Sequence, residues 1–139
     1  MISIAQDVIA GLKRTPKRIS SRWFYDAKGD ALFQQIMKLP EYYLTRAEFS
    51  VLSTHAVDIF APFNQNESIQ LIELGAGDGE KTRILLNYLR NSGRDFTYVP
   101  IDISQNALNQ LSKALKSEYP NIELLPLQDD YFSALKNPV

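Results

Sequence analysis

The sequence contains no cysteine, one histidine and one tryptophan among its 139 residues. Without cysteine, the chain can form neither a disulfide framework nor a thiolate metal site. Its formal net charge of −1 lacks the basic surplus of a nucleic-acid binder. No apolar run approaches the roughly 18 residues that span a bilayer, and the N-terminus lacks the features of a secretory signal. We therefore expect a cytoplasmic protein without a metal, nucleic-acid or membrane partner.

What the chain does contain is typical of a globular protein. Apolar residues make up 45% and charged residues 22% of the sequence, which is enough to form a hydrophobic core. The pattern of apolar residues changes near residue 68. We therefore expect a helical segment over residues 1–67 and an alternation of strands and helices over residues 68–139.

Apolar spacing predicts three helices in the first segment. A short helix is expected at the very start, and a second over residues 31–39, before Pro40. The third carries its apolar residues between positions 49 and 60. Thr45 and Glu48 have the spacing of a capping box, in which the two side chains satisfy free amides at the start of a helix.

The second segment alternates strongly between strand and helix patterns. Strands are predicted at 69–74, 96–101 and 122–127, with helices at 80–91 and from Ser104 onward. Such alternation implies a parallel sheet with right-handed crossovers. Pro126 fits an edge strand better than a central one. The expected architecture is a doubly wound α/β sheet, or the first half of one.

A glycine-rich turn follows the first predicted strand and leads directly into a helix. Gly75, Gly77 and Gly79 have G-x-G-x-G spacing, and acidic Glu73 precedes them. Glycine permits a tight turn and lets a ligand approach the backbone, and the turn amides favour a polar or anionic group. Dinucleotide-binding turns have G-x-G-x-x-G spacing instead. The turn favours a different ligand, with a purely structural turn as the alternative.

Acidic residues follow the next two strands. Asp102 stands at the carboxyl end of the second strand, where an acidic side chain can accept hydrogen bonds from ribose hydroxyls. NAD enzymes share this feature, so Asp102 indicates an adenosine-like ligand without specifying which one. A surface or helix-capping aspartate is the alternative. The stretch Gln128-Asp129-Asp130-Tyr131 adds an acidic turn after the third strand.

Two longer stretches resemble the histidine-specific methyltransferase family. Residues 23–26 and 39–48 resemble its W-F-Y-D and L-P-E-Y-Y-x-T-R-x-E signatures, and residues 73–83 and 98–104 continue the likeness. The glycine turn itself resembles motif I of the class I methyltransferases. This family includes the ergothioneine-pathway enzyme that trimethylates the α-amino group of histidine.

The resemblance implies N-terminal helices followed by the first half, β-α-β-α-β, of a class I methyltransferase Rossmann-like sheet. Its cofactor would be S-adenosylmethionine. Lys81 would meet the methionine carboxylate, Asp130 the adenine amino group and Tyr131 the adenine ring. The full set of expected cofactor-binding residues is Gly75, Gly77, Lys81, Asp102, Asp130 and Tyr131.

The resemblance also implies an amino-acid substrate, with Tyr42 and Tyr25 helping to hold it. Methyl transfer would be a direct displacement by a neutral amine, with the protein mainly supplying orientation and no metal required. No residue is assigned as catalytic. A non-catalytic cofactor-binding half that needs a partner, and a nucleotide-binding oxidoreductase fragment, are the alternatives.

The family is more than twice as long as this chain. Its usual strand order would place strand 69–74 at the centre of the sheet, beside a strand that this sequence does not supply. We therefore expect strand 69–74 to be an exposed edge, through which the chain associates with itself or with a complementing chain. The chain alone is expected to be inactive.

Overall fold

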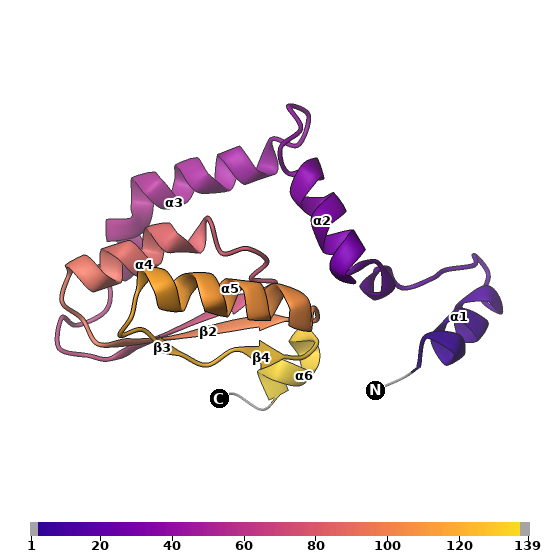
Figure 1. The fold of residues 1–139 in the computed structure, drawn as a ribbon. Helices are drawn as coiled ribbons and strands as arrows, with labels where there is room; N and C mark the ends of the chain where they lie inside the picture. The colour runs from indigo at the N-terminus through magenta and orange to yellow at the C-terminus, as the bar shows by residue number, and fades with distance from the viewer. Residues whose placement is uncertain (1–2, 137–139) are drawn as a thin grey trace.

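A computed structural model describes residues 3–136 and shows a helical front that leads into a parallel sheet (Figure 1). The front comprises α1 (Ile4–Leu12), a 3-10 turn η1 (Ser21–Phe24), α2 (Ala27–Ile36) and α3 (Leu44–Phe60). The sheet segment comprises β1 (Ile69–Leu74), α4 (Thr82–Asn91), β2 (Phe96–Asp102), α5 (Gln105–Glu118), β3 (Glu123–Leu124), β4 (Leu127–Gln128) and α6 (Tyr131–Lys136). No helix within residues 3–136 has both the length and the apolar character to cross a membrane.

The sheet confirms the predicted α/β class. β1 runs parallel to β2, in register from Ile69 opposite Phe96 to Leu74 opposite Ile101. β3 and β4 both run parallel to β2 along its other side. They are two halves of the single strand that the sequence predicts, separated around Pro126. Among the described residues β1 pairs only with β2, so it is an edge strand, as expected.

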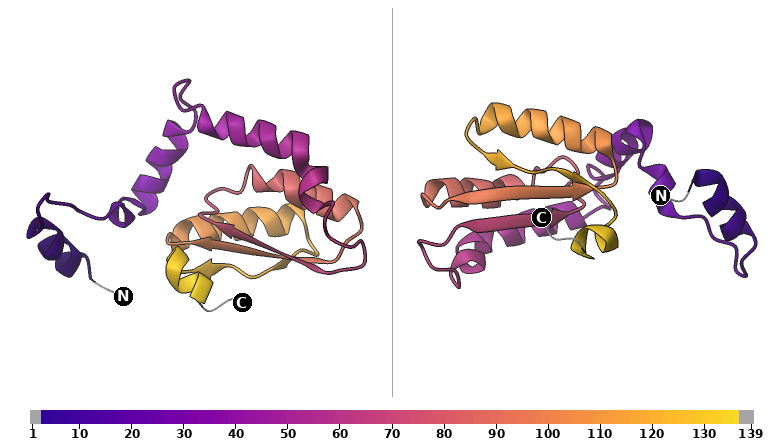
Figure 2. Two further views of the ribbon diagram at one scale, coloured as in Figure 1. Left: turned by 180° about the vertical axis from the view of Figure 1, so that it is seen from behind. Right: turned by 90° about the horizontal axis from the view of Figure 1, so that it is seen from below.

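Alternate residues of β2 point to opposite faces of the sheet. On one face, Tyr98 packs in a buried cluster with Leu86 of α4 and Leu111 of α5. On the other face, Val99 packs with Ala134 of α6. Helices α4 and α5 therefore cover one face of the sheet, while the short α6 covers only part of the opposite face (Figure 2).

The helices of the front differ in how firmly they are attached. The end of α3 is anchored because Phe60 is buried against α4 and β1 and its ring stacks on Tyr88 at a centroid distance of 5.3 Å. α2 contains no buried residue, and α1 buries only Gly11. In Figure 1, α1 lies apart from the sheet. Apolar packing therefore holds α3 in place but not α2.

Capping hydrogen bonds explain where some of the helices begin. Ser104 caps α5, as predicted, by accepting from the Ala107 amide at 3.1 Å. α2 begins earlier than predicted because Asp26 accepts from the Gly29 amide at 2.8 Å and caps it. The predicted capping box of α3 is wrong: the helix begins at Leu44 and its cap has no side-chain hydrogen bond.

Candidate functional site

The glycine-rich turn leaves β1 at its carboxyl end and is tied to the neighbouring strand. Gly75, Gly77 and Gly79 have φ values of 75°, 54° and 66°, a region that costs other residues roughly 1–2 kcal/mol. The amide of Gly75 donates to the Ile101 carbonyl at 2.7 Å. The glycines therefore let the chain reverse sharply while staying bonded to β2.

Asp102 lies directly beside this turn. Its Oδ2 accepts from the Gly77 amide at 3.2 Å, and its Oδ1 accepts from the Ser104 amide at 2.9 Å. These two bonds fix the carboxylate at the end of β2. A Cβ at Gly77 would meet no atom within 4 Å, so the turn borders open space there. The glycine turn and Asp102, which are separate motifs in the sequence, thus lie side by side. We refer to them together as the rim.

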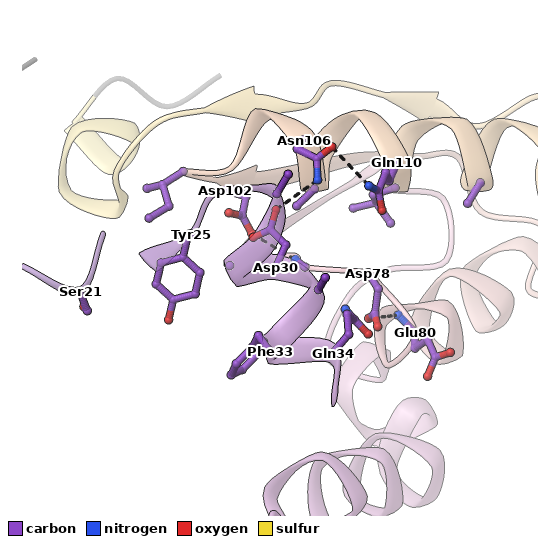
Figure 3. Close-up of a pocket in the computed structure, with 18 of the residues that line it drawn as sticks. Ser21, Tyr25, Asp30, Phe33, Gln34, Asp78, Glu80, Asp102, Asn106 and Gln110 are labelled. Carbon is purple, nitrogen blue, oxygen red and sulfur yellow. Dashed lines mark hydrogen bonds between the residues drawn. The ribbon is translucent and has the colours of Figure 1, made fainter. Parts of the chain in front are cut away.

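A cavity of about 1490 Å³ lies between this rim and the helical front (Figure 3). A site for one small molecule is typically about 300–1,000 Å³, so this space is larger than one small ligand requires. Six of the residues expected from sequence line it: Tyr25, Gly75, Gly77, Asp102, Asp130 and Tyr131.

Asp130 and Tyr131 enter the cavity at the start of α6. Asp130 accepts from the amides of Phe132 and Ser133, both at 3.1 Å, so its carboxylate also caps this short helix. The Tyr131 hydroxyl lies against Gly75, where a side chain on that residue would collide with it. Partial burial raises the pKa of Tyr131, and the negative charge of Asp102 raises it further.

Three aromatic rings connect the loop around Tyr42 with the cavity. Phe33 makes edge-to-face contacts with Tyr25, at 6.4 Å between centroids, and with Tyr42, at 6.1 Å. Tyr25 and Phe33 line the cavity, whereas Tyr42 packs behind Phe33. The sequence carries no signal that marks Phe33 as a cavity residue, because its place on the apolar face of a predicted helix resembles an ordinary core position.

Two of the predicted site residues, Tyr42 and Lys81, do not line the cavity. The Nζ of Lys81 forms an ion pair with Oε2 of Glu48 in α3. The lysine therefore joins the start of α4 to the helical front.

Glu73, the acidic residue before the glycine turn, lies beneath it. Its carboxylate accepts from the Thr82 hydroxyl at 2.6 Å and from the buried Tyr98 hydroxyl. Burial raises the pKa of Glu73, although both hydrogen bonds oppose that shift. The residue therefore ties the end of β1 to α4 and to β2, and it is not a cavity residue.

The charges around the cavity are mostly negative. Its charged side chains are Asp30, Asp78, Glu80, Asp102 and Asp130, against Lys38 and Arg83. Arg83 forms an ion pair with Glu118, with 2.8 Å between Nε and Oε2. Such a wall favours a cationic ligand over a pyrophosphate. Within residues 3–136, no three or more potential ligands group around a metal position.

Comparison with known proteins gives a clear family match. The sequence profile described as "Histidine-specific methyltransferase, SAM-dependent" matches residues 4–139. The histidine N-alpha-methyltransferases of Mycolicibacterium smegmatis and Mycobacterium tuberculosis are 40% and 38% identical over 93% and 94% of this chain. Ergothioneine biosynthesis protein 1 of Neurospora crassa is 33% identical over 91% of the chain.

The chain spans only part of each of these relatives. It corresponds to 39% and 40% of the two mycobacterial proteins and to 14% of the Neurospora protein.

Proposed function

We propose a function from one premise: the chain belongs to the histidine-specific, S-adenosylmethionine-dependent methyltransferase family. It forms the cofactor-binding part of an N-methyltransferase that acts on the amino group of histidine or a related amino acid. The observation that carries this proposal is the bond from the Gly77 amide to Asp102, which joins the glycine turn and the acidic strand end into one rim.

The residues of the rim fit the cofactor of this family. The open space beside Gly77 admits a ligand against the backbone, and Asp102 is positioned to accept from ribose hydroxyls. Asp130 and Tyr131 would hold the adenine. Lys81 would meet the methionine carboxylate after leaving Glu48. When bound, the cofactor supplies a methyl group on a positively charged sulfur, which needs no further activation.

The task left for the chain is orientation and electrostatics. The carboxylates around the cavity would stabilise positive charge on a ligand, and their sign opposes a dinucleotide pyrophosphate. Tyr25 and Phe33 face the cavity from the helical front, with Tyr42 supporting Phe33. We assign the substrate side of the site to residues 1–67 and the cofactor side to residues 68–139.

Calorimetry with S-adenosylhomocysteine and, separately, with NADH tests this proposal. The chain should bind S-adenosylhomocysteine, and Asp102→Ala should weaken that binding by at least tenfold. Gly93→Ala serves as the control, because Gly93 lies at the far end of β2 from the cavity. A folded chain that ignores S-adenosylhomocysteine, or that prefers NADH, would overturn the proposal.

The edge of β1 supports a proposal about partners. Ile72 and Leu74 are exposed there, and β2 is the only strand that pairs with β1 within residues 3–136. About three fifths of each mycobacterial relative lies outside the matched region. We propose that a strand from polypeptide equivalent to that remainder pairs with β1, and that turnover in the cytoplasm requires it.

A further inference from the structure

α2 borders the cavity, and the ring contacts of its Phe33 are to Tyr25 and Tyr42 of the helical front. No residue of α2 is buried, and its apolar side chains Leu32 and Ile36 are exposed. A helix that presents Phe33 to the cavity must nevertheless keep a defined position. Because α2 buries no residue, polar contacts have to hold it against the sheet segment.

Asp30 makes those contacts. Its Oδ2 accepts from the Ser104 hydroxyl at 2.7 Å and from the Asn106 side-chain amide at 3.3 Å, across to the first turn of α5. Figure 3 shows Asp30 reaching from α2 toward Asn106, with Asp102 beside it. Ser104 is only 4% exposed, so the stronger bond is shielded from water.

The hydrogen bonds continue from Ser104 to the cofactor rim. The Ser104 amide donates to one oxygen of Asp102, whose other oxygen accepts from the Gly77 amide. Because its hydroxyl donates to Asp30, the Ser104 oxygen keeps a lone pair for the Ala107 amide that it caps. Asp30 therefore fixes the residue that holds Asp102.

We propose that Asp30 is a positioning residue that couples α2 to the Asp102 carboxylate through Ser104. It has two effects: it holds the helix that carries Phe33 against α5, and it sets the orientation of Asp102. Cofactor binding and the placement of the helical front are then linked. This inference rests on the proposed function, because the ligand at Asp102 is taken to be the cofactor.

Calorimetry with S-adenosylhomocysteine on Asp30→Ala tests the coupling. Loss of a shielded hydrogen bond to a carboxylate should raise Kd about tenfold. Asp26→Ala is the matched control: it removes the aspartate that caps the same helix, and the Asp26 side chain accepts from the Gly29 amide within the helical front. Its Kd should be unchanged. Equal Kd values in the wild type and Asp30→Ala would overturn the inference.

A double-mutant cycle separates positioning from direct ligand contact. If Asp30 acts through Ser104, Asp30→Ala should have little further effect on Kd in the Ser104→Ala background. Fully additive losses would overturn the proposed route. If circular dichroism shows that Asp30→Ala is unfolded, Asp30→Asn is tested in its place. Asparagine keeps the shape of the aspartate side chain but lacks its charge, so the Kd for S-adenosylhomocysteine should rise about threefold. An unchanged Kd in Asp30→Asn would also overturn the inference.

Hydrogen exchange supplies a readout that a purely structural role would not move. Added S-adenosylhomocysteine should slow amide exchange in α2 of the wild type and of Asp26→Ala, but not of Asp30→Ala. Protection of α2 in Asp30→Ala that equals the wild type would overturn the coupling alone. A wild-type chain with no affinity for S-adenosylhomocysteine would instead overturn the proposed function, and the inference with it.

Discussion

Lys81 and Glu48 form an ion pair between the start of α4 and α3, across 33 positions of sequence. The sequence pattern predicts that Glu48 caps its own helix, and the family resemblance implies that Lys81 binds the cofactor. The structure shows no such cap and brings the two side chains together. Both remain partly exposed, so the pair is available for exchange with a ligand carboxylate.

Substitutions on either side of this ion pair should have opposite effects on cofactor binding. Lys81→Met should weaken S-adenosylhomocysteine binding about tenfold, because the ligand carboxylate loses a charged partner. Glu48→Gln should strengthen it about two- to threefold, since an exposed ion pair is worth roughly 0.2–1 kcal/mol and no longer competes. Calorimetry measures both.

Methylthioadenosine is the control ligand for this pair, because it has no amino-acid end. Its Kd should be the same in Lys81→Met, Glu48→Gln and the wild type. A loss of methylthioadenosine affinity in Lys81→Met would mean that the lysine supports the turn and does not meet the carboxylate.

Gly77→Ala should abolish or strongly weaken S-adenosylhomocysteine binding. Both the strain of a left-handed alanine and the new methyl group at the ligand face of the turn contribute. Gly93→Ala is the matched control, because Gly93 has a φ of 70° and also borders open space. Each variant should lose about 1–2 kcal/mol in urea unfolding. Equal ligand affinity in the two variants would contradict a binding role for the turn.

The buried carboxyl of Glu73 should make the stability of the chain depend on pH. Burial raises its pKa in the folded state above the ordinary 4.5. Between 4.5 and that higher value the folded chain binds more protons than the unfolded chain, so this group's contribution falls as pH rises. Glu73→Gln does not titrate. The difference in unfolding free energy, wild type minus Glu73→Gln, should therefore decrease from pH 4.5 upward and then level off.

Urea titrations at several pH values measure this difference, in which the other carboxylates of the two proteins largely cancel. A difference that increases with pH would mean that the hydrogen bonds from Thr82 and Tyr98 outweigh burial.

The edge strand β1 should accept a complementing chain. Mixed with the part of the Mycolicibacterium smegmatis relative outside the matched region, the chain should form a 1:1 complex in light scattering. Ile72→Lys should weaken that complex, because it places a charge on the exposed face of the edge strand. Ile9→Lys, an exposed position on α1, should not. A monomer unaffected by the added polypeptide, or self-association alone, would contradict the proposal.

Prediction from the sequence succeeded where the signals are local. The glycine turn and the strand-helix alternation are written in consecutive residues, so β1, β2, α4 and α5 were all expected. The short α6 was missed, because six residues do not establish a helical period. Apolar spacing places the start of α2 at residue 31, whereas the Asp26 cap, three residues before Gly29, starts the helix at Ala27.

The site shows the same division more sharply. By itself, the sequence determined the chemical types at the rim formed by the glycine turn and Asp102, because the turn geometry demands glycine and the strand ends in an aspartate. Only tertiary structure decided which side chains meet: Lys81 forms an ion pair with Glu48, and Asp30 accepts a hydrogen bond from Ser104. The reason is physical. The conformation of the glycine turn depends on near neighbours in sequence, whereas these two contacts join elements far apart in sequence and depend on how whole helices pack.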